Sequence, residues 1–373
     1  MRYEPRKELA GLPKTVHGGQ AWRLSGVEDF SQNLNPLGPP PELLDEIQKV
    51  LAGVGHYPDD SALAAKTAVA NLLGLQPENV QMGAGSSEII RNFPNTFLEP
   101  GDRALMFYPS FAEYAQQCRI AGVEVDSLQL LPEDDFRIDT ERLSVALRQH
   151  PYKALYLCNP NNPTGRVEPR EKVLGIVKEC ADLNILVFLD ETLLDLVPNA
   201  ASVSCAAMVN EYPNLVVASS LTKSFAIPGL RIGYGVAVPE FIAEMEKVRL
   251  PWNLGQLEQS LATYLVSDRM DYVTEGAKLL EKENKIMQAQ LDEVCFPVGH
   301  LSDSFFYFVS TASLKVTGAE MQHLMLKHNI MIRDCASFGP EFADYIRFCV
   351  KDRERNQAFV AAAEKVMQAM EGR

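Results

Sequence analysis

The stretch SLTKSFAIPGLRIGYG, residues 220–235, places two cations and several hydroxyl groups among apolar residues of the kind that fill a protein interior. Lys223 and Arg231 lie eight positions apart. A buried cation is costly unless it is neutralised, paired or used covalently. A lysine chosen at random most often extends its ammonium group to solvent. The other strand ends of the chain decide between these two interpretations.

The composition limits the class of protein. The 373 residues, 46% hydrophobic and 23% charged, suffice for two globular domains. The net charge of −14 argues against a nucleic acid or an anionic membrane as partner, although a few local cations can still bind a small anion. Seven cysteines without a CxxC pair favour a reducing compartment over a disulfide framework or a metal site. With no signal peptide and no apolar membrane span, we expect a cytoplasmic protein.

Helices and short apolar strands alternate along the first two thirds of the chain, after helices expected at 41–53 and 61–74. Such alternation predicts a mostly parallel α/β sheet that is buried on both faces. After about Pro251 a long polar helix at 272–294 precedes short strands, which predicts a smaller α+β domain. The expected strands are 79–85, 102–108, 153–160, 185–191, 215–221 and 231–238 in the first region, and 304–310, 330–335 and 345–351 in the second.

Polar groups follow four of the strands, at the sheet edge where open α/β sheets bind ligands. Gly83–Glu88 (GAGSSE) opens a helix whose N-terminus can hold an anion, although alone it is more often a plain tight turn. Asn159–Gly165 (NPNNPTG) is a rigid loop that can fix an asparagine. Asp190 ends a buried strand, and Lys223 follows the next one. Independent coincidence at all four strand ends is improbable.

One cofactor explains this combination. Pyridoxal phosphate requires a lysine for a Schiff base and an acid partner for its pyridine nitrogen. It also requires a phosphate-binding cup and a donor to its phenolic oxygen. A nicotinamide dehydrogenase is disfavoured, because Glu88 stands where a GxGxxG motif needs its last glycine.

The motif order GAGSSE, YPSFAEY, NPNNPTG, LDE and SLTKSFAIPGLRIGYG resembles that of fold-type I pyridoxal-phosphate enzymes of the class I and II aminotransferase group. The resemblance covers essentially the whole chain. It implies a large domain, 45–255, with a mostly parallel seven-stranded sheet, and a smaller α+β C-terminal domain, 256–373. An N-terminal segment, 1–44, is expected to pack against the small domain and the active site.

The resemblance also implies roles for single residues. Lys223 forms the Schiff base, Asp190 pairs with the pyridine nitrogen, and Asn162 binds the phenolic oxygen. Phe111 stacks on the ring, and Arg347 binds the substrate α-carboxylate as a bidentate fork. The cofactor phosphate is expected to contact Gly85, Ser86, Ser87, Ser220 and Arg231, and also Tyr57 from the neighbouring subunit of a homodimer.

Two subfamilies of that group remain open. The segments HGG (17–19), DFSQNLNPLG (29–38) and PWN (251–253) resemble the L-threonine-O-3-phosphate decarboxylases of cobalamin biosynthesis. That resemblance implies that His17, Asn33 and Arg333 bind a substrate phosphate. One methyl group is worth only about 1–3 kcal/mol in a pocket, so threonine phosphate and serine phosphate both stay candidates. Histidinol-phosphate aminotransferases share the general pattern and are the alternative.

The chain departs from the family pattern at Leu193. Relatives commonly have an aromatic residue, often tyrosine, three positions after the strand-end aspartate. Because leucine cannot donate a hydrogen bond to the phenolic oxygen, Asn162 is expected to do so alone.

Overall fold

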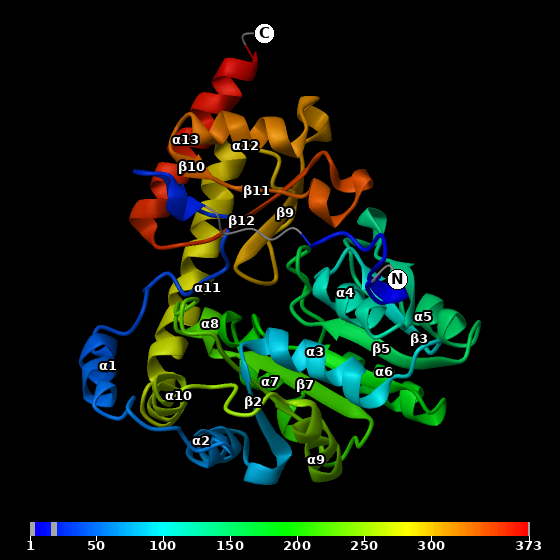
Figure 1. Cartoon of the computed structure of the whole chain (residues 1–373). Coiled ribbons are helices and arrows are strands. Elements are labelled where there is room, and N and C mark those ends of the chain that lie inside the picture. Colours follow the sequence, from blue (N-terminus) through cyan, green and yellow to red (C-terminus); the bar gives the residue numbers. More distant parts are fainter. Residues whose placement is uncertain (1–3, 16–20, 372–373) are drawn as a thin grey trace.

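A seven-stranded sheet forms the centre of the protein (Figure 1). The computed structural model describes residues 4–15 and 21–371. The strand order is β2-β8-β7-β6-β5-β3-β4, and only β8 runs antiparallel to its neighbours. The predicted mostly parallel seven-stranded sheet is therefore confirmed. Its strands are β2 (Val80–Ala84), β3 (Arg103–Tyr108), β4 (Glu124–Gln129), β5 (Tyr152–Cys158), β6 (Leu186–Asp190), β7 (Leu215–Ser220) and β8 (Ile232–Val236).

The central strands are apolar throughout because both faces of the sheet are covered. Successive side chains of a strand point to opposite faces. Tyr156 and Phe188 accordingly join one buried cluster, whereas Leu155 and Val187 join another. The first cluster includes α3 (Ser86–Phe97), α4 (Glu113–Ile120) and α9 (Pro239–Val248), and the second includes α2 (Leu63–Leu73), α5 (Thr140–Leu147), α6 (Arg170–Asp182) and α10 (Gln256–Asp268).

A second, smaller sheet stands above the first in Figure 1, and the long helix α11 (Met270–Glu293) runs between the two regions. The strand order of this smaller sheet is β11-β12-β9, and both pairs of neighbouring strands are antiparallel. The α+β architecture expected for the part of the chain after the large sheet is therefore confirmed. Its elements are β9 (Phe306–Ser310), α12 (Gly318–Leu326), β10 (Ile330–Met331), β11 (Arg333–Asp334), β12 (Tyr345–Cys349) and α13 (Arg353–Glu371).

The N-terminal part of the chain contacts both regions. Arg6 donates to the carbonyl of Ile120 at the end of α4 (2.9 Å), whereas β1 (Glu28–Asp29) pairs in parallel with β10. Helix α1 (Leu43–Leu51) then leads to α2. Two short helices, α7 (Ala200–Val203) and α8 (Leu221–Ser224), lie next to strand β7 in the sequence. The division into segments 1–44, 45–255 and 256–373 stays a prediction.

Several elements had no prediction from the sequence, namely β4, α5, α9, α10 and α12. Strand β4 (EVDSLQ) is an edge strand with three exposed residues, and it therefore lacks the continuous apolar run that marks the central strands. All seven cysteines have free thiols. Within the described part of the chain, no helix is long and apolar enough to cross a membrane.

Candidate active site

A cavity of about 630 Å³ lies where the carboxyl ends of the large sheet face β11 and β12. Eleven of the residues singled out in the sequence line it. They come from strand ends, loops and the N-terminal segment that are far apart in the chain. These residues are Asn33, Ser86, Ser87, Phe111, Asn162, Asp190, Ser220, Lys223, Arg231, Arg333 and Arg347.

Asp190 ends β6 as a buried carboxylate with two protein donors. Tyr114 donates its hydroxyl to Oδ2 (2.8 Å), and the backbone N–H of Thr192 donates to Oδ1 (2.8 Å). Burial raises the pKa of Asp190, and both bonds oppose that shift because they stabilise the charged form. Tyr114 was not predicted as a site residue, although it stands in the YPSFAEY motif three residues after Phe111. The carboxylate is thus oriented to face a cation in the cavity.

Lys223 follows β7 in the one-turn helix α8. Burial, Arg347 and Arg231 together lower the pKa of Lys223 to about 8. Its Nζ makes no ion pair and no hydrogen bond with the part of the chain that the structure describes. A lysine in this setting loses its proton close to neutral pH, as a lysine that forms a Schiff base must.

The first turn of α3 and Arg231 form an anion cradle. Gly85, the N-cap of α3, has φ +76°, and a Cβ built there would lie 2.6 Å from Nη2 of Arg231. A Cβ at Gly233 would meet the backbone nitrogen of Ser86. Both glycines therefore leave the helix N-terminus and the guanidinium close together, where helix N–H groups favour an anion. Ser220 caps α8 and donates to the carbonyl of Ile232 (3.1 Å).

Arg347 connects three distant segments. Its Nη1 donates to Oδ1 of Asn162, and its Nη2 donates to the carbonyl of Ser31 (2.6 Å). The Asn162 oxygen is thereby occupied, which leaves Nδ2 as the donor that the predicted role requires. Nε of Arg347 is buried and has no hydrogen-bond partner among the described residues.

A second group of polar atoms faces the same cavity. Asn33 is 4% exposed, and within residues 4–15 and 21–371 its Oδ1 has no hydrogen-bond partner. Arg333 donates from Nη2 to Oγ of Ser337 (2.6 Å), and Ser337 also lines the cavity. Buried polar groups without partners are uncommon in folded proteins, so Asn33 Oδ1 and Arg347 Nε indicate a polar ligand. Ser337 and the carbonyl of Ser31 were not predicted from the sequence: Ser337 lies in no quoted motif, and Ser31 acts through its backbone, which a motif of side chains does not reveal.

Three further residues singled out in the sequence have different outcomes. His17 lies outside the described residues. Tyr57 is 76% exposed, does not line the cavity, and packs against Trp252 in a tilted ring pair with centroids 4.6 Å apart. Leu193 lines the cavity and supplies no donor there, as expected from the sequence.

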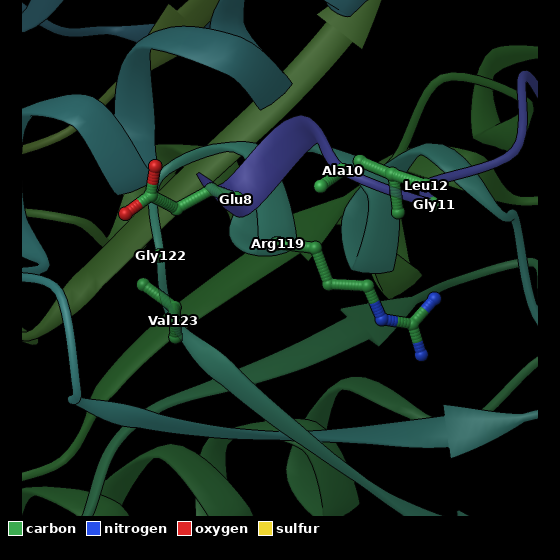
Figure 2. Close-up of a pocket in the computed structure, with 7 residues that line it drawn as sticks. All are labelled: Glu8, Ala10, Gly11, Leu12, Arg119, Gly122 and Val123. Carbon is green, nitrogen blue, oxygen red and sulfur yellow. The ribbon is translucent and has the colours of Figure 1, made fainter. Parts of the chain in front are cut away.

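A second hollow, of about 350 Å³, lies between the N-terminal segment and the end of α4 (Figure 2). Among the described residues, Glu8 and Arg119 are the charged side chains that line it, and Glu8 already accepts a hydrogen bond from Arg6 (3.3 Å). It contains none of the residues predicted to bind a ligand, so we assign the chemistry to the larger cavity.

The geometry agrees with comparisons to known proteins. The family model of aminotransferases of class I and II matches residues 25–362. The chain belongs to this family. A putative threonine-phosphate decarboxylase of Caldanaerobacter subterraneus subsp. tengcongensis is 29% identical over 95% of both chains. Histidinol-phosphate aminotransferase 1 of Nitrosococcus oceani is 28% identical over 98% of this chain and 94% of its own.

Solved structures show the same fold. L-threonine-O-3-phosphate decarboxylase from Porphyromonas gingivalis superposes with a TM-score of 0.79 at 25% identity, over 92% of this chain and all of that one. Histidinol-phosphate aminotransferase from Sinorhizobium meliloti, in complex with pyridoxal-5'-phosphate, gives a TM-score of 0.84 at 22% identity, over 99% of both chains. The fold-type I assignment and pyridoxal phosphate as cofactor are thus confirmed.

The residues present fit this cofactor. The cradle of Gly85 and Arg231 suits a phosphate, and the oriented carboxylate of Asp190 suits a protonated ring nitrogen. Lys223 opens into the same cavity with a lowered pKa. Phe111 provides an apolar ring in the cavity wall.

The Tyr114–Asp190 bond generates a first prediction. In Tyr114→Phe the carboxylate loses a donor that stabilises its charged form, so the pKa of Asp190 rises further. Because a hydrogen bond to a charged group is worth about 1.5–3 kcal/mol, we expect roughly tenfold or greater loss of affinity for pyridoxal phosphate. An absorbance titration of the apoenzyme measures it. Tyr156→Phe, a buried tyrosine bonded to Cys118 instead, is the control. Equal affinity in Tyr114→Phe and the parent would contradict this role.

Glu191, next to Asp190, generates a second prediction. It accepts hydrogen bonds from Ser204 Oγ and from the backbone N–H of Cys205 (2.7 Å), and burial raises the pKa of Glu191 to about 7. The contribution of Glu191 to folding stability is therefore fully present below pH 4.5, the ordinary pKa of a glutamate. This contribution is lost as the pH rises through about 7, the pKa in the folded state.

Glutamine does not titrate. As the pH rises from 5 to 8, we therefore expect the unfolding free energy of Glu191→Gln to increase relative to that of the parent by on the order of 2–3 kcal/mol. Urea unfolding at a series of pH values measures the difference. Glu211→Gln, at an exposed position, should show no such trend. A difference that stays constant with pH would mean that Glu191 does not change its charge in this range.

Proposed function

We propose that the chain decarboxylates L-threonine-O-3-phosphate or L-serine-O-phosphate. The observation that supports this proposal is a pair of anion-binding groups in the cavity that Lys223 also lines. Arg347, joined to Asn162, forms the first group, and Arg333 with Asn33 forms the second. A phosphorylated α-amino acid carries a carboxylate and a phosphate at once and can engage both groups.

The cofactor is held by this chain's own residues. Lys223 would bind it covalently, Asp190 would pair with its ring nitrogen, and the cradle at Gly85 and Arg231 would hold its phosphate. When bound, pyridoxal phosphate supplies a ring that withdraws the electrons left at Cα when one of the bonds to Cα breaks.

The arginines decide which bond breaks. Arg347 would bind the α-carboxylate and Arg333 the distal phosphate, so the two guanidinium groups orient the substrate about Cα. A substrate held with its carboxylate bond in the reacting position would lose CO₂, whereas one held to lose the Cα proton would undergo transamination.

A proton must replace the lost carboxylate at Cα. Lys223, with a pKa of about 8, both holds and releases a proton near neutral pH, and we assign this delivery to its Nζ. The products are CO₂ and an amino-alcohol phosphate. These are 1-aminopropan-2-ol phosphate from threonine phosphate, which would supply the linker of the cobalamin nucleotide loop, and ethanolamine phosphate from serine phosphate.

A histidinol-phosphate aminotransferase is the second candidate, favoured by the relative from Nitrosococcus oceani at nearly the same identity. The two candidates differ in how they use the cavity. Histidinol phosphate has no carboxylate, so it would engage only the phosphate-binding group. Arg347 would then bind the α-carboxylate of glutamate, which forms from the amino acceptor 2-oxoglutarate.

The deciding experiment measures CO₂ release from L-threonine phosphate and L-serine phosphate. A parallel assay measures glutamate formation from 2-oxoglutarate and histidinol phosphate. We expect CO₂ without any requirement for a keto acid. Glutamate formation without CO₂ would establish the aminotransferase and refute the decarboxylase.

Two variants separate cofactor binding from substrate binding in that experiment. Lys223→Ala should lose the visible absorbance of the lysine-bound cofactor together with all turnover. Arg333→Ala should keep the absorbance and raise KM for threonine phosphate by roughly tenfold or more, since a charged hydrogen bond is lost. An unchanged KM would remove Arg333 from the substrate site.

We also propose that the chain is a homodimer. The side chain of Tyr57 is exposed and does not line the cavity, whereas a residue that binds the cofactor of its own subunit would do so. Seven further exposed large apolar side chains lie on α1, in the turn after it, on α2 and in the loop before α10, whereas five lie elsewhere in the described part of the chain. The seven are Leu44, Leu51, Val54, Leu63, Leu72, Leu250 and Trp252.

Light scattering at micromolar concentration should give twice the chain mass of 41.4 kDa. Leu63→Asp, in the first turn of α2, should shift the protein towards monomer because it places a charge in the interface. Val145→Asp on α5, which is equally exposed, should not. A fully active monomer would contradict the shared site.

A further inference from the structure

Asn35 hydrogen-bonds to the backbone of the cofactor lysine and of the residue after it. Its backbone N–H donates to the carbonyl of Lys223 (3.0 Å), and its Nδ2 donates to the carbonyl of Ser224 (2.9 Å). Its Oδ1 accepts from the N–H of Leu37 (3.1 Å), and the residue is 3% exposed. One side chain and its own backbone thus bind two consecutive carbonyls at the lysine.

This contact matters because α8 is short. The carbonyls at the end of a helix have no partner within that helix, and α8 has only the residues Leu221–Ser224. The chain then turns sharply at Ala226, with φ +52°. Ser224 Oγ also donates to Oδ2 of Asp195 (2.7 Å), so this turn is held from two sides.

Asn35 is itself fixed by α11. A Cβ built at Gly276 would lie 2.5 Å from both Nδ2 and Oδ1 of Asn35, so the amide packs directly on the helix backbone. Tyr272, one turn earlier, donates its hydroxyl to the carbonyl of Leu37 (3.0 Å). A larger residue at 276 cannot be accommodated without moving the amide of Asn35.

The same short segment carries the anion-binding contacts. The carbonyl of Ser31 accepts from Arg347, and Asn33 faces the cavity. We propose that Asn35 is a positioning residue that fixes Lys223 relative to the anion-binding side chains of the cavity. This inference rests on the proposed role of Lys223 as the cofactor lysine.

Two variants of the holoenzyme test it by different routes. Asn35→Ala removes the side-chain contact, and Gly276→Ala keeps the asparagine but displaces its amide. The absorbance of the lysine-bound cofactor is titrated with pH in the absence of substrate. We expect its midpoint to rise by about half a unit or more in both variants, because Nζ moves away from the two arginines that disfavour its charge. The charged groups that face this cavity are Asp190, Glu113, Arg231, Arg333 and Arg347.

We also expect kcat to fall about tenfold or more in both variants, because misplaced reacting groups lose rate steeply. Asn284→Ala is the matched control. Asn284 is also a buried asparagine, and its Nδ2 donates to the carbonyls of Ser302 (3.1 Å) and Ser304 (3.0 Å). It does not line the cavity. This variant should lose thermal stability without any change in the absorbance midpoint.

A parent-like midpoint and kcat in Gly276→Ala would overturn the inference, and this variant decides alone if Asn35→Ala does not fold. A parent that lacks the absorbance band, or a Lys223→Ala variant that keeps it, would instead refute the proposed function. The two failures are therefore distinguishable.

Discussion

The arrangement of the cavity depends on one buried guanidinium. Arg347 sits in the small sheet, but its hydrogen bonds reach the loop after β5 through Asn162 and the N-terminal segment through Ser31. No carboxylate hydrogen-bonds to it in the described chain. A buried cation in this state is tolerated because its donors are largely satisfied by neutral oxygens, and the remaining Nε is available to a ligand. Stability and ligand binding are therefore in competition at this residue.

The same electrostatics explain the lysine. Arg347 and Arg231 both lower the pKa of Lys223, and burial adds to their effect. Asp190 adds a carboxylate to the lining of the same cavity. The site thus combines cations that attract anionic substrates with a lysine that they keep close to neutrality, and neither property is available without the other.

Much of this site could be predicted from the sequence, because its residues follow buried strands. A strand that is apolar throughout and ends in Asp190 or Ser220 places those groups at one edge of the sheet, whatever the remaining packing. Tyr114 and Asn35 were not predicted as functional, because their roles depend on which segments meet in space. Strand β4 was missed for a similar reason, since an edge strand is not buried on both faces and carries no distinctive pattern.

The antiparallel direction of β8 has a consequence for engineering. Because β8 runs against β7, its first residue lies at the same edge of the sheet as the last residue of β7. The connection at 221–231 therefore leaves that edge and returns to it within eleven residues, and the separation of Lys223 and Arg231 is set by its length. Insertions, deletions and circular permutation at this connection would alter that separation directly. The exposed turn at 148–151, between α5 and β5, lies outside the cavity wall and is a more suitable position for a new terminus or an inserted tag.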